Sequence, residues 1–292
     1  MEKYLHIKEI QEYLEYLKLD KSSCTISSYT YSIGTFFDFM EIENINDVGS
    51  TESSDCRMWQ NNLKERGLVN SSINTNTRVL KALYNWMVDN GYVSKNPFLK
   101  IKELKTPKRE IDYLSEQEEV SMINACKKIQ DKLMIAMMIT LGLRRDEVIN
   151  IRVSDISEQR HITIFGKGQK ERTLILQQDV YELLKKHLET RTNKSEYVFI
   201  SNHGSKFVGT SVYRKIKSIA KKAGITPDRI DNIHPHLLRH TFATNLIECG
   251  TDIVVVQSAL GHSSLNTTMI YAHVKNTTLD NAMLNQRSLN VG

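Results

Sequence analysis

Apolar residues recur every three or four positions along the first part of the chain, which is the period of helices packed on one side. Four such stretches precede the first long break in the pattern: residues 5–18, 25–41, 54–65 and 73–89. Gly91 follows the last one, where a glycine favours the left-handed turn that ends a helix. Short connections between them predict a small four-helix bundle, and we interpret its aromatic residues as core rather than as base-stacking surfaces.

The pattern breaks at residues 106–114, a polar and charged segment that contains Pro107. This composition is typical of a linker between domains. We therefore predict one domain over residues 1–105 and a second over residues 115–292.

The second domain is expected to open with a helix, because Ser115 and Glu118 have the S-x-x-E spacing of a capping box. Another helix is expected from Asp131. Pro235 suits the first turn of a helix, where the N–H that proline lacks would be unpaired anyway. The later helices are expected at 211–223, 236–248 and 252–260.

Between these helices the period changes to the alternation of strands. HITIF at 161–165 and RTLIL at 172–176 are joined by the glycine-containing GKGQKE, which predicts an antiparallel hairpin. EYVFIS at 196–201 is expected to add a third strand. The fold class is therefore mainly α: a helical bundle followed by an α+β domain with a small antiparallel sheet.

Composition narrows the class of protein. The chain has 292 residues, 40% of them hydrophobic, which is enough for two cores. Its four cysteines show no CxxC pair, which favours a reducing compartment over a disulfide framework. The N-terminus lacks the apolar core of a signal peptide, and the longest apolar run, at 133–143, is too short to span a bilayer. We expect a cytoplasmic protein with no membrane partner.

The net charge of +5 is unevenly distributed. Residues 1–105 hold 13 basic and 14 acidic side chains, whereas residues 106–292 hold 26 and 20. A mildly basic second domain is compatible with a polyanionic partner such as DNA, but it does not identify one.

Four short segments in the second domain carry the candidate chemistry. They are TLGLRRDE with Arg144, GKGQKER with Lys167, HPHLLRH with His236, Arg239 and His240, and LGHSSLNTTMIY with His262 and Tyr271. The three residues of the third segment lie at i, i+3 and i+4 and would share one face of a helix.

Together these side chains form a cationic site with a phenolic nucleophile. The arginine fork matches the oxygens of a phosphate, so two arginines can stabilise a phosphorane-like transition state. A lysine can protonate a leaving alkoxide, and a histidine can accept the proton of a tyrosine. Because no carboxylate cluster for Mg²⁺ accompanies them, the sequence predicts phosphoryl transfer through a phosphotyrosyl ester with no metal or cofactor.

Four motifs follow one another along the chain: G-L-R-x-x-E, G-K-G-x-K-x-R, H-x-L-R-H and L-G-H. A tyrosine stands nine residues after the histidine of the last motif. In these motifs the chain resembles the tyrosine recombinases of the phage integrase family, and in layout the Xer-type recombinases. The resemblance implies a SAM-like core-binding domain, a tyrosine recombinase catalytic domain, and strand exchange through a 3′-phosphotyrosyl intermediate and a Holliday junction.

The resemblance also implies a role for each catalytic position. Arg144 and Arg239 would hold the scissile phosphate, Lys167 would protonate the 5′-hydroxyl leaving group, His236 would exchange protons with the tyrosine, His262 would bind the phosphate, and Tyr271 would be the nucleophile. Six further residues would support the site or contact DNA.

Of those six, Glu147 would orient the cations and His240 would be structural, whereas Lys170, Arg172, Arg214 and Lys215 are candidate DNA contacts. Lys170 stands near enough to Lys167 in the sequence to take its place as the general acid.

The expected partner is double-stranded DNA with inverted half-sites, bound by a homotetramer or by a heterotetramer with a related recombinase. The 21 residues after Tyr271, which include LDNAMLN, would dock on a neighbouring protomer, as the C-terminal helix of the family does. The sequence does not separate chromosome-dimer resolution from integration or excision of a mobile element. Three rival readings are a type IB topoisomerase-like enzyme, a non-catalytic DNA-binding regulator, and a zinc hydrolase with His236 and His240 as ligands.

Overall fold

The computed structural model describes residues 2–107, 111–166, 170–191, 195–201, 204–262, 264 and 267–271. Contacts between Cα atoms divide the chain into two compact units, residues 1–109 and residues 110–292. The boundary falls within the segment that the sequence marks as a linker.

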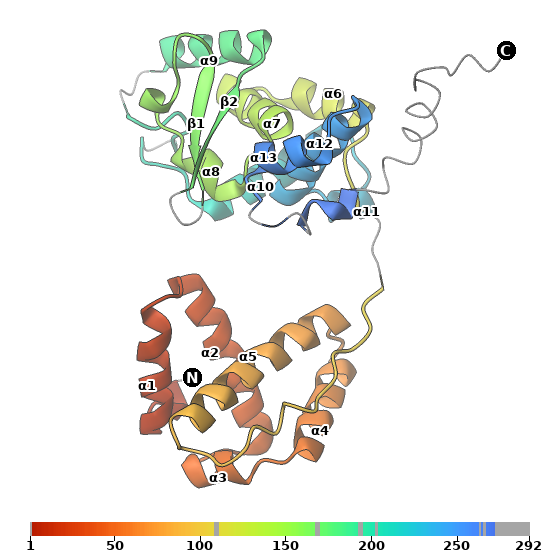
Figure 1. Cartoon of the computed structure of the whole chain (residues 1–292). Helices are drawn as coiled ribbons and strands as arrows, with labels where there is room; N and C mark the ends of the chain where they lie inside the picture. Colours follow the sequence, from red (N-terminus) through yellow and green to blue (C-terminus); the bar gives the residue numbers. More distant parts are fainter. Residues whose placement is uncertain are drawn as a thin grey trace, which may run out of the picture. The chain divides into compact units, whose positions relative to one another are not determined.

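The N-terminal unit is a bundle of helices (Figure 1). Its helices are α1 (Lys8–Lys18), α2 (Ser23–Met40), α3 (Ile45–Ser50), α4 (Ser53–Glu65) and α5 (Asn70–Asp89), after a 3-10 turn at Glu2–Tyr4. At the centre of its core, the ring of Phe36 meets those of Trp59 and Phe98 edge-on, at centroid distances of 5.2 and 5.3 Å. All three side chains are fully buried, so aromatic residues do form this core.

The four helices predicted for this unit are confirmed. Helix α3 is an addition to the prediction. It has 6 residues, too few to show an apolar period, and it is held by Asn44, whose side chain accepts hydrogen bonds from the backbone of Asn46 and Asp47.

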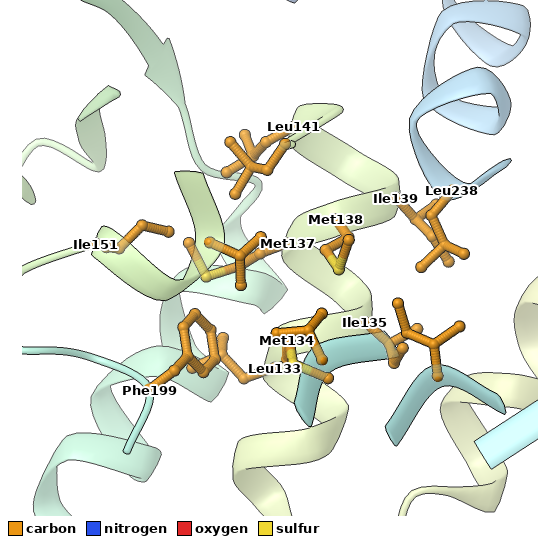
Figure 2. Close-up of a cluster of buried hydrophobic side chains, with 14 of the residues drawn as sticks. Leu133, Met134, Ile135, Met137, Met138, Ile139, Leu141, Ile151, Phe199 and Leu238 are labelled. Carbon is orange, nitrogen blue, oxygen red and sulfur yellow. The ribbon is translucent and has the colours of Figure 1, made fainter. Parts of the chain in front are cut away.

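The C-terminal unit is built around α7 (Ile129–Leu141), which packs against α6 (Glu116–Ala125), α9 (Gln178–Thr190) and α12 (Pro235–Glu248). The buried residues of α7 lie on all of its sides: Leu133, Met134, Ile135, Met137, Met138, Ile139 and Leu141. Figure 2 shows these side chains meeting Phe199 on one side and Leu238 of α12 on another. A helix that is apolar all round belongs in the centre of a fold.

The remaining helices of this unit surround that core. They are α8 (Arg145–Asn150), α10 (Gly209–Lys222), α11 (Pro227–Ile230) and α13 (Ile253–Leu260), with a 3-10 turn at Val153–Asp155. The capping box at the start of α6 is confirmed, since Ser115 and Glu118 bond each other's backbone N–H groups. Pro235 stands in the first turn of α12, as predicted.

The predicted hairpin is also confirmed. Strands β1 (His161–Phe165) and β2 (Glu171–Ile175) pair antiparallel, with His161 opposite Ile175 and Phe165 opposite Glu171. The backbone N–H of Gly166 bonds the carbonyl of Lys170 at 2.7 Å and closes the ladder.

The prediction of a third strand at 196–201 is wrong for the part of the chain that the structure describes. This segment makes only isolated bridges, between Tyr197 and Arg152 and between Ile200 and Lys206. Its consecutive residues Val198 and Phe199 are both buried, so the side chains do not alternate between two faces. The segment is a buried connection, and the sheet contains β1 and β2.

No helix in the described ranges is long and apolar enough to cross a bilayer. The four cysteines are free thiols.

Two glycines end the helices that deliver the basic motifs. Gly142 follows α7 with φ +59°, and Gly261 follows α13 with φ +63°. Both are left-handed C-caps, a conformation that costs other residues about 1–2 kcal/mol. A Cβ on Gly142 would also collide with the ring of Phe242.

Replacing Gly142 with alanine should therefore destabilise the C-terminal unit by more than the backbone strain alone. The matched control is Gly224→Ala, since Gly224 has φ +76° but no atom within 4 Å of a new Cβ. We expect the loss of unfolding free energy in Gly142→Ala to exceed that in the control by about 1–3 kcal/mol. Hydrogen exchange of the α7 amides in the full chain measures both, and equal losses would contradict the packing argument.

Candidate active site

Arg144 enters the site from the turn between α7 and α8. The buried Leu143 anchors this turn, and Arg144 is the N-cap of α8. The backbone N–H of Arg144 donates to Glu147 Oε2 at 2.8 Å, and its Nη1 donates to Glu147 Oε1 at 2.7 Å. The G-L-R-x-x-E motif is thus a local device, in which the glutamate caps its own helix and holds the arginine.

Glu147 is also the buried partner of Arg172 on β2. Arg172 Nη1 and Nη2 donate to the two carboxylate oxygens at 3.0 and 2.8 Å, which is a bidentate pair. The side chain of Glu147 is 4% exposed and that of Arg172 is 11% exposed. Arg172, proposed from the sequence as a DNA contact, therefore points into the protein.

Arg239 reaches the same carboxylate from α12. Its Nη1 lies 3.9 Å from Glu147 Oε2, and its side chain is 4% exposed. Nη1 donates to the carbonyl of Gly142 at 2.6 Å, and Nη2 donates to that of Leu260 at 2.5 Å. One buried guanidinium thus links the C-terminal ends of α7 and α13.

The Leu260–His262 turn completes the cationic cluster. Arg144 Nη2 donates to the carbonyl of Gly261 at 3.2 Å. The backbone N–H of His262 bonds the carbonyl of Gln257 at 3.1 Å, and Gln257 Nε2 donates to the carbonyl of His262. The imidazole Nδ1 of His262 lies 2.9 Å from Thr268 Oγ1.

Tyr271 lies against α12 and α13. It is 1% exposed and belongs to a small apolar cluster with Phe242, Ala243, Ile247, Val256 and Leu260. Its phenolic oxygen is 2.5 Å from His240 Nδ1, and its backbone N–H donates to the carbonyl of Thr268 at 3.0 Å. The histidine in contact with the tyrosine is therefore His240, which the sequence analysis treated as structural.

The other candidate residues differ in their exposure and partners. His236 is exposed on α12, with its ring centroid 6.3 Å from that of His234. Lys215 Nζ is 2.5 Å from Asp131, so that carboxylate neutralises it, whereas Arg214 and Lys170 are exposed. Lys167, the proposed general acid, lies outside the described residues.

Two family models match the chain. Residues 112–278 match the phage integrase family, and residues 10–91 match the phage integrase N-terminal SAM-like domain. The chain belongs to the phage integrase family of tyrosine recombinases.

Curated relatives of this recombinase agree with that assignment. The tyrosine recombinase XerC of Oceanobacillus iheyensis is 30% identical, and the alignment covers 94% of each chain. The tyrosine recombinase XerA of Pyrococcus furiosus is 32% identical over 94% of this chain and 92% of its own. The protein is thus a site-specific DNA recombinase, an enzyme that cleaves and rejoins DNA strands.

Solved structures share the fold. XerA recombinase has a TM-score of 0.53 with 26% identity, covering 97% of this chain and 99% of its own. XerH recombinase bound to a palindromic difH substrate has a TM-score of 0.75 with 23% identity, covering 90% of this chain and 80% of its own.

The charged groups of the recombinase site shift the pKa values of their neighbours. Burial raises the pKa of Glu147, but the hydrogen bonds and charges of Arg172 and Arg144 outweigh it and lower the pKa to about 2. Glu147 is therefore ionised at neutral pH. Three guanidinium groups around one carboxylate leave an excess of positive charge for an anionic ligand.

The histidines next to these cations are neutral at physiological pH. Burial, followed by the charges of Arg239 and Arg144, lowers the pKa of His262 to about 4. Burial and the neighbouring His236 lower that of His240 to about 4. Burial raises the pKa of Tyr271 to about 12, although Arg239 opposes it, so the phenol is protonated.

Sequence reasoning did not single out Thr268, whose signal was its place three residues before Tyr271 in NTTMIY. The hypothesis of a zinc hydrolase needs a set of metal ligands. In the described part of the chain, no three His, Cys, Asp or Glu side chains are grouped so that they could hold a metal ion.

Glu147→Gln should cost stability mainly at neutral pH, because it leaves Arg172 buried without a counter-charge. The folded pKa of Glu147, about 2, lies below its ordinary value of 4.5. Its stabilisation is therefore full above pH 4.5 and is lost as the pH falls towards 2. We expect the free energy of unfolding of the wild type to exceed that of the variant by about 3 kcal/mol at pH 7.

The measurement is the urea midpoint of the C-terminal unit, read by pulsed hydrogen exchange of α12 between pH 7 and pH 3. The control is Glu196→Gln, because Glu196 forms an exposed pair with Arg152. A difference from wild type that does not shrink on acidification would contradict the assignment to Glu147.

Proposed function

We propose that this recombinase cleaves DNA by attack of the Tyr271 phenolic oxygen on a phosphate held by Arg144 and Arg239. The observation that carries the proposal is the number of N–H groups that these two arginines leave for a ligand. Among the described residues, each uses two N–H groups on protein acceptors, and a guanidinium has five. Within that part of the chain, three N–H groups of each arginine are left for phosphate oxygens, with His262 beside them.

In the proposed step a bond forms between the Tyr271 oxygen and phosphorus, and the bond from phosphorus to O5′ breaks. The product is a 3′-phosphotyrosyl ester, which a second 5′-hydroxyl can reverse without ATP. Lys167 would supply the proton to O5′, with Lys170 as the alternative donor. The tyrosine proton would pass to a histidine.

Two histidines compete for that proton. The resemblance favours His236, whereas the 2.5 Å contact with the phenol favours His240. We propose that His240 holds Tyr271 before cleavage and that His236, exposed three residues before Arg239, acts once DNA is bound. A phenol that is 1% exposed cannot reach a phosphate of duplex DNA, so the 267–271 turn must move first.

At the level of assembly, we propose that four protomers join two duplexes with inverted half-sites. Residues 1–105 would bind the core site of the DNA, and residues 115–292 would cleave its strands. Residues 106–114 would link these two domains. Solved relatives bound to a palindromic substrate and as a dimer on a core site support such an arrangement. We place the reaction in the cytoplasm, in chromosome-dimer resolution or in movement of a mobile element.

Tyr271→Phe should abolish covalent trapping on nicked suicide substrates while leaving DNA binding in place, because the variant lacks the nucleophilic oxygen. Denaturing gels detect the covalent complex, and mobility shifts detect binding. Tyr181→Phe, a tyrosine on α9, serves as the matched control and should trap like wild type.

Three outcomes distinguish the rival functions. Trapping by Tyr271→Phe would overturn the nucleophile assignment. Binding without trapping by wild type would favour a regulator, and relaxation of supercoiled plasmids of any sequence would favour a topoisomerase.

Deleting residues 277–292, which lie outside the described residues, should leave half-site binding intact but reduce synapsis. The proposed reason is loss of the segment that docks on a neighbouring protomer. Analytical ultracentrifugation on paired sites measures the assembly, and full recombination by the truncated chain would count against the docking role.

A further inference from the structure

Thr268 connects two functional residues of the site. Its side chain is fully buried, and its Oγ1 lies 2.9 Å from His262 Nδ1. Its carbonyl accepts the backbone N–H of Tyr271 at 3.0 Å. One residue thus fixes the ring of His262 and the backbone of the nucleophile.

The direction of the Thr268 hydrogen bond follows from counting protons. The helical residues Thr140 and Thr241 donate their hydroxyl to the carbonyl four residues earlier. Among the described residues, Thr268 Oγ1 has His262 Nδ1 as its hydrogen-bond partner. If that nitrogen carried a proton, the buried hydroxyl proton would have no acceptor within the described ranges, at a cost of about 1–3 kcal/mol.

The charge state of His262 completes the argument. Its pKa is lowered to about 4 by burial and by Arg239 and Arg144, so the ring is neutral at physiological pH. A neutral imidazole has one donor nitrogen and one acceptor nitrogen. When Nδ1 accepts from Thr268, the single ring proton is on Nε2.

We propose that Thr268 is a positioning residue that fixes His262 in the Nε2–H tautomer, so that the ring donates a hydrogen bond to the phosphate. The inference rests on the proposed function, in which His262 contacts the scissile phosphate. Phosphate oxygens only accept hydrogen bonds, so the opposite tautomer would turn a lone pair towards an anion. Because burial and the neighbouring arginines keep this histidine neutral, the tautomer rather than a positive charge makes it a donor.

Substitutions at Thr268 separate this role from packing. Thr268→Val keeps the shape and removes the hydroxyl, whereas Thr268→Ser keeps the hydroxyl and removes a methyl group. Thr267→Val is the matched neighbour, because Thr267 is exposed. Circular dichroism melts of all three variants verify folding.

The tautomer is read directly, without DNA, by nitrogen NMR of isotope-labelled histidine in the full chain. We expect protonated Nε2 and bare Nδ1 for His262 in wild type and in Thr268→Ser, and a mixture in Thr268→Val. A wild-type ring protonated on Nδ1 would overturn the inference.

Cleavage of a suicide substrate gives the second test. We expect Thr268→Val to cleave about tenfold more slowly than wild type, the effect of one lost hydrogen bond, with Thr268→Ser and Thr267→Val near wild type. His262→Gln supplies an amide donor that has no tautomer. In that background Thr268→Val should cause no further loss. An equal loss in both backgrounds would show a structural role and overturn the inference.

The two tests separate this inference from the proposed function. A wild-type protein with the Nε2–H tautomer that forms no covalent complex would refute the proposed function and leave the role of Thr268 on the ring intact. A protein that cleaves normally with valine at position 268 would refute the positioning role and leave the proposed function intact.

Discussion

The carboxylate of Glu147 is the interaction on which the active site depends. It receives hydrogen bonds from Arg144 and Arg172 and lies 3.9 Å from Arg239. Two like charges 4 Å apart repel by about 4 kcal/mol at an effective dielectric constant of 20, so three guanidinium groups could not gather here without an anion. With a single negative charge among them, they gather and still leave an excess of positive charge for a phosphate.

Helix ends provide the rest of the cation binding. The carbonyls of Gly142 and Leu260 both accept from Arg239, and that of Gly261 accepts from Arg144. Carbonyls at helix C-termini carry partial negative charge and lack partners within the helix. The glycine C-caps of α7 and α13 therefore do more than end their helices, because carbonyls at these ends accept hydrogen bonds from Arg239 and Arg144.

The same arrangement buries Tyr271, the proposed nucleophile. Tyr271 is buried and protonated, and its phenolic oxygen contacts a neutral His240. Thr268 contacts both His262 and Tyr271, because its hydroxyl bonds the imidazole of His262 and its carbonyl accepts the N–H of Tyr271. Thr268 thus connects the backbone of Tyr271 with the ring of His262.

Local sequence determined the elements of this protein. The apolar periods specified the helices of the N-terminal bundle, the Ser115 capping box and Pro235 specified helix starts, and HITIF with RTLIL specified the hairpin, because each signal acts over a few neighbouring residues. Apart from local pairs such as Arg144 and Glu147, tertiary structure decided which side chains meet. It turned residues 196–201 into a buried connection, directed Arg172 inward to Glu147, paired Lys215 with Asp131, and placed His240 rather than His236 against Tyr271. The two residues of each hydrogen-bonded pair are between 25 and 84 positions apart in the sequence. The packing of the elements, and not a local pattern, therefore selects these pairs.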